Sequence, residues 1–74
     1  MITRLQYFNC VVETGSISEA SRVFDVQPSS ISRQIAALEK DLGVRLLNRT
    51  TRNLGLTEAG QRYYAYSQRI VSEV

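Results

Sequence analysis

Two stretches of helical periodicity meet at a three-residue break, and this break restricts the possible folds more than any other feature. Ser16 or Ser18 can cap a helix that runs to Phe24, and residues 25–27 then form a tight turn. Pro28 follows at once, and proline fits the first position of a new helix because its missing amide costs nothing there. Two helices joined by three residues predict a helix-turn-helix unit.

The helix that begins at Pro28 divides its side chains between two faces. One face carries an aliphatic stripe that we expect in the core, made of Ile31, Ile35, Leu38 and Leu42. The opposite face carries small, polar and basic side chains, namely Ser29, Arg33, Ala36, Ala37 and Lys40. Gly43 is the natural end of the helix, because glycine readily adopts the left-handed conformation found there.

An amphipathic helix precedes this pair and ends near Thr14, before Gly15. Thr3 and Gln6 have the spacing of a capping box, so we expect this helix to start after Thr3. Its apolar stripe consists of Leu5, Phe8, Val11 and Val12. In the helix that follows, we expect three side chains to face inward, those of Ala20, Val23 and Phe24.

Two short apolar runs follow the third helix, at residues 46–49 and 53–56, and predict a small two-stranded hairpin. Thr57 can cap a final helix over residues 58–74, which has no stop signal, so we expect the chain to end inside it. The apolar stripe of this helix consists of Ala59, Tyr63, Tyr66, Ile70 and Val74. The predicted fold is mainly α, with a three-helix core and a two-stranded wing followed by a long helix.

The composition argues against an enzyme. The chain has no histidine, which removes the usual general base, the commonest zinc ligand and every Ser-His or Cys-His pair. Cys10 is the one cysteine, and we interpret it as a small buried hydrophobe. The longest apolar run, residues 35–38, is far shorter than the roughly 20 residues that cross a bilayer. We expect a cytoplasmic protein that has no membrane contact, cofactor or metal.

The charge is distributed unevenly, although the net value is only +2. Between residues 43 and 72 the only acid is Glu58, and the bases are all arginines, namely Arg45, Arg49, Arg52, Arg62 and Arg69. Arginine suits bidentate contacts with phosphate and guanine. The pattern indicates a nucleic-acid partner, with a merely solvated basic face as the alternative.

The helix after Pro28 has the properties needed to enter the major groove of DNA. Such a helix needs an apolar stripe toward its own core, an opposite face free of bulky aliphatics, and donors near its N-terminus. Arg33 can donate two hydrogen bonds to one guanine or one to a phosphate, and Ala36 keeps the face low for close approach. We expect Lys40 to contact the DNA backbone. Further donors near the phosphates or bases are Ser29, Ser30 and Ser32.

The hairpin tip concentrates polar and basic residues, namely Arg49, Thr51 and Arg52. These side chains can clasp phosphates beside the major groove or place an arginine in a narrow minor groove. The alternative is ordinary solvated turn chemistry.

The last helix carries an apolar face that is large for so small a domain, formed mainly by Tyr63, Tyr66 and Ile70. Part of this face must cover the core, and the rest indicates a partner helix. Packing onto its own domain alone is the alternative, because the seam extends for barely two heptads.

Five blocks of sequence, taken in order, carry a resemblance to a known family. They are EASRVF at 19–24, VQPSSISRQI at 26–35, LEKDLG at 38–43, LLNRTTR at 46–52 and LTEAG at 56–60. Together they resemble the signature of LysR-type transcriptional regulators over essentially the entire chain, with far more specificity than a lone helix-turn-helix pattern. By position, the resemblance assigns DNA contacts to Pro28, Ser29, Ser32, Arg33, Arg49, Thr51 and Arg52.

The resemblance implies two parts, a winged helix-turn-helix DNA-binding domain at 1–57 and the start of a linker and dimerisation helix at 58–74. It implies a homodimer on an inverted repeat, with recognition helices in successive major grooves and wings at the adjacent minor grooves. The expected dimer interface consists of Tyr63, Tyr66, Ile70 and Val74. Full-length members form tetramers and carry an effector-binding domain, which we expect to be absent from these 74 residues. A small-molecule effector would act only through that domain.

The sequence departs from the family pattern in its packing and capping residues. It has Ala20 and Ser21 where relatives often have paired alanines, and Phe24 and Leu47 where they often have leucine and phenylalanine, which suggests compensated packing. Gln27 stands where serine or threonine usually caps the recognition helix. Glutamine is a poor cap, so either the helix start is looser or Gln27 itself reaches DNA.

Sequence-specific binding of double-stranded DNA as a dimer is the leading hypothesis. The second is a winged-helix module for protein interaction, in which the basic face is incidental and the apolar last helix is the functional surface. Duplex binding with a steep salt dependence favours the first, and salt-insensitive or absent binding favours the second.

Overall fold

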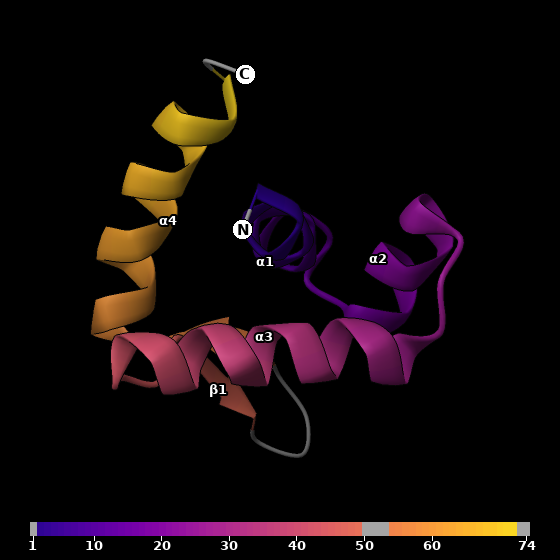
Figure 1. Cartoon of the computed structure of the whole chain (residues 1–74), viewed down its shortest axis with the longest axis horizontal. Helices are drawn as coiled ribbons and strands as arrows, with labels where there is room; N and C mark the ends of the chain where they lie inside the picture. Colours follow the sequence, from indigo (N-terminus) through magenta and orange to yellow (C-terminus); the bar gives the residue numbers. More distant parts are fainter. Residues whose placement is uncertain (1, 50–53, 73–74) are drawn as a thin grey trace.

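A computed structural model describes residues 2–49 and 54–72. Its elements are α1 (Ile2–Thr14), α2 (Ile17–Phe24), α3 (Pro28–Leu42), β1 (Leu47–Arg49), β2 (Leu54–Leu56) and α4 (Glu58–Ser72). In Figure 1, α3 runs across the view with α1 above it and β1 below it, α2 lies near the N-terminal end of α3, and α4 rises near its C-terminal end. The predicted mainly α fold with a two-stranded antiparallel wing is confirmed.

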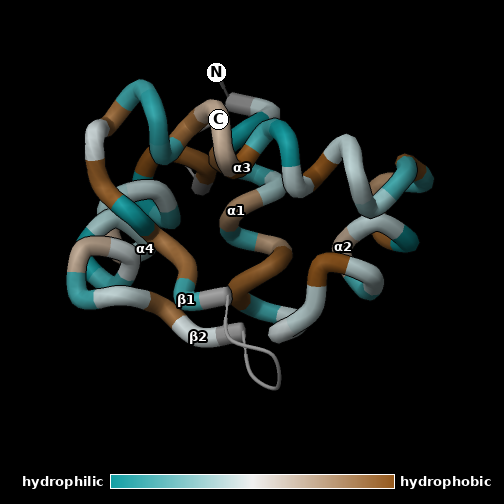
Figure 2. The backbone as a smooth tube through the Cα atoms, turned by 90° about the horizontal axis from the view of Figure 1, so that it is seen from below, coloured by the Kyte–Doolittle hydropathy of each residue, from teal (hydrophilic) through white to brown (hydrophobic). Residues whose placement is uncertain are grey.

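Helix α1 occupies the centre of the molecule, between α4 on one side and α2 on the other (Figures 1 and 2). Leu5, Phe8 and Val11 are buried on its inner face, as their spacing predicts. The predicted capping box is wrong, because α1 already begins at Ile2 and Thr3 lies inside it. An N-cap residue needs an extended backbone, which a residue inside the helix does not have.

The core joins α1, α2, α3 and the start of the hairpin, and Tyr63 and Tyr64 of α4 pack against it. Its buried members are Phe8, Val11, Ala20, Ile31, Ile35, Leu38, Leu46 and Leu47. Phe24 packs on this cluster with its ring 4.9 Å from that of Tyr7, and Leu47 is buried. Two predicted core residues are instead exposed, Val23 by 65% and Leu42 by 40%. Val23 lies beside rather than on the inner face of the short α2, where Ser21 is buried, and Leu42 ends α3 just where the chain turns away.

Capping residues lie at both ends of α2 and at the C-terminal end of α3. Ser16 caps α2 by accepting a hydrogen bond from the amide of Glu19 at 3.2 Å. Asp25 ends α2 in the left-handed conformation at φ 55°, and the Val26 amide then donates to the carbonyl of Ser21. The predicted start at Pro28 and the predicted end of α3, at Gly43 with φ 73°, are both confirmed.

The hairpin is short and antiparallel, with Leu47 opposite Leu56, Asn48 opposite Gly55 and Arg49 opposite Leu54. Thr57 then caps α4, because its Oγ1 accepts from the Gly60 amide at 2.9 Å. The same hydroxyl donates to the carbonyl of Arg45 at 2.6 Å, which fastens the start of α4 to the segment before β1.

Helix α4 lies against α1 through a polar contact as well as through aromatic rings. The fully buried Ser67 donates a 2.6 Å hydrogen bond to Oδ1 of the buried Asn9. Around this bond, the ring of Phe8 lies 5.9 Å from Tyr63 and 6.3 Å from Tyr64. None of the helices in the described ranges is both long and apolar enough to span a membrane.

Candidate nucleic-acid interface

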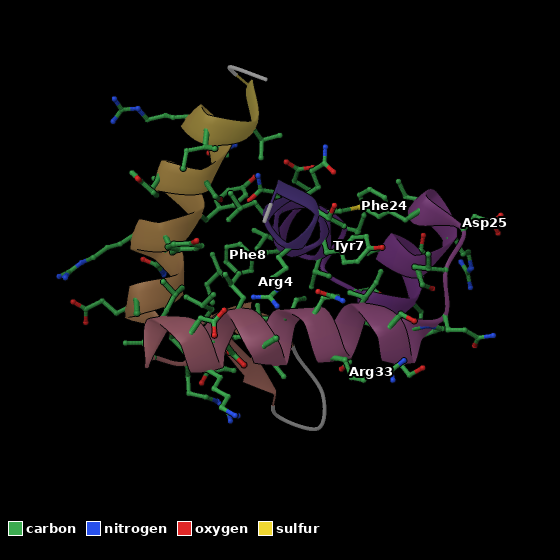
Figure 3. The ribbon with its side chains drawn as sticks, viewed as in Figure 1. Arg4, Tyr7, Phe8, Phe24, Asp25 and Arg33 are labelled. Carbon is green, nitrogen blue, oxygen red and sulfur yellow. The ribbon has the colours of Figure 1, made fainter. Side chains whose placement is uncertain are left out.

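The outer face of α3 presents a continuous stripe of exposed side chains. Ser29, Arg33, Ala36 and Lys40 follow one another at helical spacing, and all four are exposed. Figure 3 shows Arg33 on the side of α3 that points away from α1. We call these four residues the recognition stripe. It coincides with the face that the sequence predicts for DNA.

The other candidates in α3 lie at its start and at the edges of the recognition stripe. Gln27 and Pro28 are exposed, whereas Ser30 and Ser32 are half-buried. Gln27 forms no side-chain cap hydrogen bond, as expected for glutamine at this position. The first turn of α3 therefore has no side-chain acceptor from its N-cap, which suits it to a phosphate oxygen.

Both cations on α3 are without a partner among the described contacts. Within residues 2–49 and 54–72, neither Arg33 nor Lys40 forms a hydrogen bond or ion pair. Three other arginines are paired at 2.7 to 3.0 Å, in Arg4–Asp41, Arg22–Glu19 and Arg62–Glu58. The recognition stripe thus keeps its positive charge available for a polyanion.

The acid nearest the end of the recognition stripe is already neutralised. Asp41 follows Lys40 directly, and its carboxylate binds the guanidinium of Arg4 at 2.7 Å. Gln34 holds the same guanidinium through Oε1 at 3.3 Å. Figure 3 shows Arg4 between α1 and α3. Arg4 of α1 therefore offsets a negative charge that would otherwise repel phosphate at the edge of α3.

Sequence reasoning missed Arg45 as a candidate contact, counting it only among the basic residues. It is exposed just before the buried Leu46, and among the described contacts its side chain has no ion pair. Its position between α3 and β1 is the signal that could have identified it, since this segment joins the two proposed DNA-contacting elements.

The wing is present, but its tip is not among the described residues. Arg49 belongs to β1 and pairs with Leu54 in the backbone register. Thr51, Arg52 and the side chain of Arg49 fall outside the part of the chain that the structure describes. Their contact with DNA stays a prediction.

The predicted dimer residues of α4 divide between the core and solvent. Tyr63 packs on the core, and burial, assisted by nearby Tyr66, raises its pKa. Tyr66 is 59% exposed with its ring 6.1 Å from that of Tyr63, and Ile70 is half-buried. Val74 lies beyond the described residues. An open apolar groove beside Tyr66 is lined by Leu42, Val44, Leu46, Ala59, Arg62 and Tyr63.

Cys10 is half-buried against the core, and burial together with Glu13 raises the pKa of its thiol. A raised pKa makes a thiol a poor nucleophile at neutral pH. Across residues 2–49 and 54–72, no three side chains of His, Cys, Asp or Glu gather as metal ligands.

A helix-turn-helix pair followed by a two-stranded hairpin is the arrangement of the winged helix-turn-helix class of DNA-binding domains. Comparison with known families narrows this class. The family described as bacterial regulatory helix-turn-helix protein, lysR family, matches residues 2–61. The chain belongs to the LysR family and contains its DNA-binding helix-turn-helix domain.

Curated relatives agree with this assignment. The chain is 47% identical to the HTH-type transcriptional activator AaeR of Escherichia coli (strain K12), over 99% of this chain and 24% of that protein. It is 49% identical to the HTH-type transcriptional regulator CrgA of Neisseria meningitidis serogroup B (strain ATCC BAA-335 / MC58), over 95% and 23%. The chain thus spans about a quarter of the length of these relatives.

Among solved structures, the chain is similar to the BenM DNA-binding domain in a complex with catB site 1 DNA. The TM-score is 0.95 at 34% identity, covering 99% of this chain and 82% of that one. For the CbnR DNA-binding domain in complex with DNA, the TM-score is 0.92 at 39% identity, covering 97% and 83%. The resemblance to LysR-type regulators that the sequence motifs indicate is confirmed.

Proposed function

We propose that this chain binds double-stranded DNA in a sequence-specific manner, with α3 in the major groove and the wing at the adjacent minor groove. The observation that carries the proposal is the recognition stripe, where Arg33 and Lys40 are exposed and unpaired within the described residues. The similar DNA-binding domains of BenM and CbnR were solved in complex with DNA, which supports the proposal.

The chemistry of the stripe suggests a division of roles along α3. Arg33 lies on its second turn and can bind the O6 and N7 atoms of one guanine. Ala36 lets the helix backbone approach the base edges, and its methyl group can meet a thymine methyl. Lys40 lies in the last turn, where a single flexible cation suits a phosphate better than a base.

The second part of the proposal is a homodimer formed through α4 on an inverted repeat. Its interface would consist of Tyr63, Tyr66, Ile70 and Val74. Tyr66 is an exposed aromatic beside an open apolar groove, which favours a partner helix here over plain solvent. In the whole protein, which its relatives suggest is about four times as long, we expect a tetramer and a separate effector domain.

These proposals describe a transcriptional regulator without catalytic activity, which acts in the cytoplasm where bacterial DNA is found. Its partners would be DNA and further copies of itself. Any small-molecule effector would bind outside these 74 residues.

The test measures the affinity for the best duplex that the wild-type chain selects from a randomised pool, at several salt concentrations. Arg33→Ala is expected to weaken binding by about 1 to 3 kcal/mol and to relax the preference at one base position. Arg22→Ala is the matched control. Arg22 is an exposed arginine of α2, and unlike Arg33 it is paired with an acid of its own helix, Glu19.

Equal loss on all duplexes after Arg33→Ala would reassign Arg33 to a phosphate. If the wild-type chain does not bind duplex DNA, or if its binding is insensitive to salt, the proposal is contradicted. A protein-interaction module would then be favoured.

A further inference from the structure

Glu39 holds the segment that leads from α3 into the wing. Its backbone carbonyl accepts hydrogen bonds from the amides of Gly43 at 2.8 Å and Val44 at 3.3 Å. Its side-chain Oε2 accepts from the amides of Leu46 at 2.8 Å and Leu47 at 3.2 Å. One residue of α3 thus binds four of the next amides along the chain.

This contact is buried, which makes it both strong and specific. Glu39 is only 8% exposed, and Leu46 and Leu47 are exposed by 0% and 2%. A carboxylate that accepts from backbone amides away from water forms stronger bonds than a neutral acceptor would. Any other placement of residues 46 and 47 would leave a buried charge without these donors, so this one is strongly favoured.

The position of Glu39 links the two elements proposed to meet DNA. It directly precedes Lys40 of the recognition stripe, and it binds the amide of Leu47, the first residue of β1. Leu46 is also bound to Thr57, the cap of α4, because the Leu46 carbonyl accepts from the amide of Thr57 at 3.0 Å. The hairpin is therefore fastened where it begins, by Glu39, and where it ends, by Thr57.

We propose that Glu39 is a positioning residue for DNA recognition, which sets the wing beside α3 so that both contact the same half-site. This inference rests on the proposed function. Glu39 need not touch DNA. Its carboxylate acts through the backbone of residues 46 and 47, and the charge itself would repel phosphate if it were exposed.

The sign of the charge effect gives a sharp test. Removing a carboxylate from a DNA-binding protein should by itself tighten binding, because the net charge becomes more positive. A positioning role predicts the opposite. Glu58→Gln is the matched control, because Glu58 loses the same charge from an exposed site whose carboxylate binds only the side chain of Arg62 among the described contacts.

The experiment uses hydroxyl-radical footprinting and affinity measurement on the duplex that the wild-type chain selects from a randomised pool. Glu39→Leu removes the acceptor while keeping similar bulk. We expect it to lose the protection that flanks the major-groove site, to keep the central protection, and to bind about tenfold more weakly. Glu39→Gln keeps one acceptor oxygen, so its flanking protection should be intermediate. Glu58→Gln should keep the wild-type footprint.

Amide hydrogen exchange of Leu46 and Leu47 shows whether the contact itself has been weakened. If Glu39→Leu does not fold, Glu39→Gln decides, and faster exchange at these two amides with unchanged flanking protection overturns the inference. A uniform loss over the whole footprint, or no loss at all in a folded Glu39→Leu variant, also overturns it. Absence of any footprint with the wild-type chain would instead reject the proposed function.

Discussion

Helices α3 and α4 are both 15 residues long, yet they treat their charged side chains in different ways. On α4, Arg62 is paired with Glu58 along the helix surface, and the most exposed large apolar side chain of the helix is Tyr66. On α3, the acids are bound by other elements, while Arg33 and Lys40 have no partner among the described residues.

The difference shows what each helix is suited to contact. A helix with its acids engaged and its cations free presents a net positive surface, which attracts a polyanion. A helix that pairs an arginine with its own acid and exposes a large aromatic side chain presents a surface suited to another protein.

The first turn of α4 packs so closely against Leu46 and Leu56 that it should tolerate no side chain at Gly60. A Cβ at this position would overlap the carbonyl oxygen of Leu46 and lie 3.1 Å from the side chain of Leu56. We expect Gly60→Ala to lower the free energy of unfolding by about 3 kcal/mol through overpacking. Urea denaturation measures this loss. Gly55→Ala is the control, since nothing lies within 4 Å of a Cβ there, and an equal loss in both variants would refute the steric account.

The buried hydrogen bond between α4 and α1 should matter for folding and not for DNA. Ser67→Ala leaves Oδ1 of the buried Asn9 without its donor, so we expect a loss of about 2 kcal/mol in unfolding free energy. Ser29→Ala on the exposed recognition stripe should show the reverse, weaker DNA binding at unchanged stability. Thermal denaturation and DNA titration of both variants measure the two effects. Weaker DNA binding by a folded Ser67→Ala variant, or lower stability of Ser29→Ala, would contradict the prediction.

Lys40 should contribute charge without sequence preference. Lys40→Ala is expected to weaken binding by about 0.5 to 1 kcal/mol on every duplex and to reduce the salt slope by about one. Affinities on the selected duplex and on a scrambled one, over a range of salt concentrations, measure both quantities. A loss confined to the selected duplex would show that Lys40 reads a base.

The smallest effect concerns the buried part of the α4 aromatic face. Burial raises the pKa of Tyr63 above its ordinary value of 10.0, so the folded state holds this proton more tightly than the unfolded state does. Its contribution to stability is fully present below pH 10 and is lost as the pH rises through the folded pKa. Tyr63→Phe should therefore make the fall in stability at alkaline pH less steep. Denaturation of the wild-type chain and of Tyr63→Phe at several alkaline pH values measures this fall in stability. An equally steep fall in both would contradict the prediction.

Local signals in the sequence were sufficient for the elements and for the recognition stripe. Ser16, Pro28, Gly43 and Thr57 mark helix ends through their own backbone chemistry, so their roles do not depend on distant residues. The face of α3 follows from helical periodicity alone. This is why the candidate DNA contacts of α3 could be named before the fold was known.

The features that sequence reasoning missed depend on partners far along the chain or on the exact path of a turn. Ser67 is polar, yet it is buried because Asn9, 58 residues earlier, supplies its acceptor. Glu39 resembles any solvated helical acid until residues 46 and 47 bring their amides to it. Val23 has the polarity of a core residue, but its angular position on α2 places it in solvent. Helical periodicity carries no information on the long-range contacts of Ser67 and Glu39.

The contact at Gly60 also has a mechanical consequence. The backbone of α4 rests directly on the Leu46 carbonyl, with no side chain of Gly60 between them. Glycine has no side chain that could yield between the two backbones, so we expect a rotation of α4 to displace Leu46 as well. Leu46 is tied in turn to Glu39 of α3. We therefore expect a rotation imposed on the far end of α4 to act on α3 through Leu46 and Glu39.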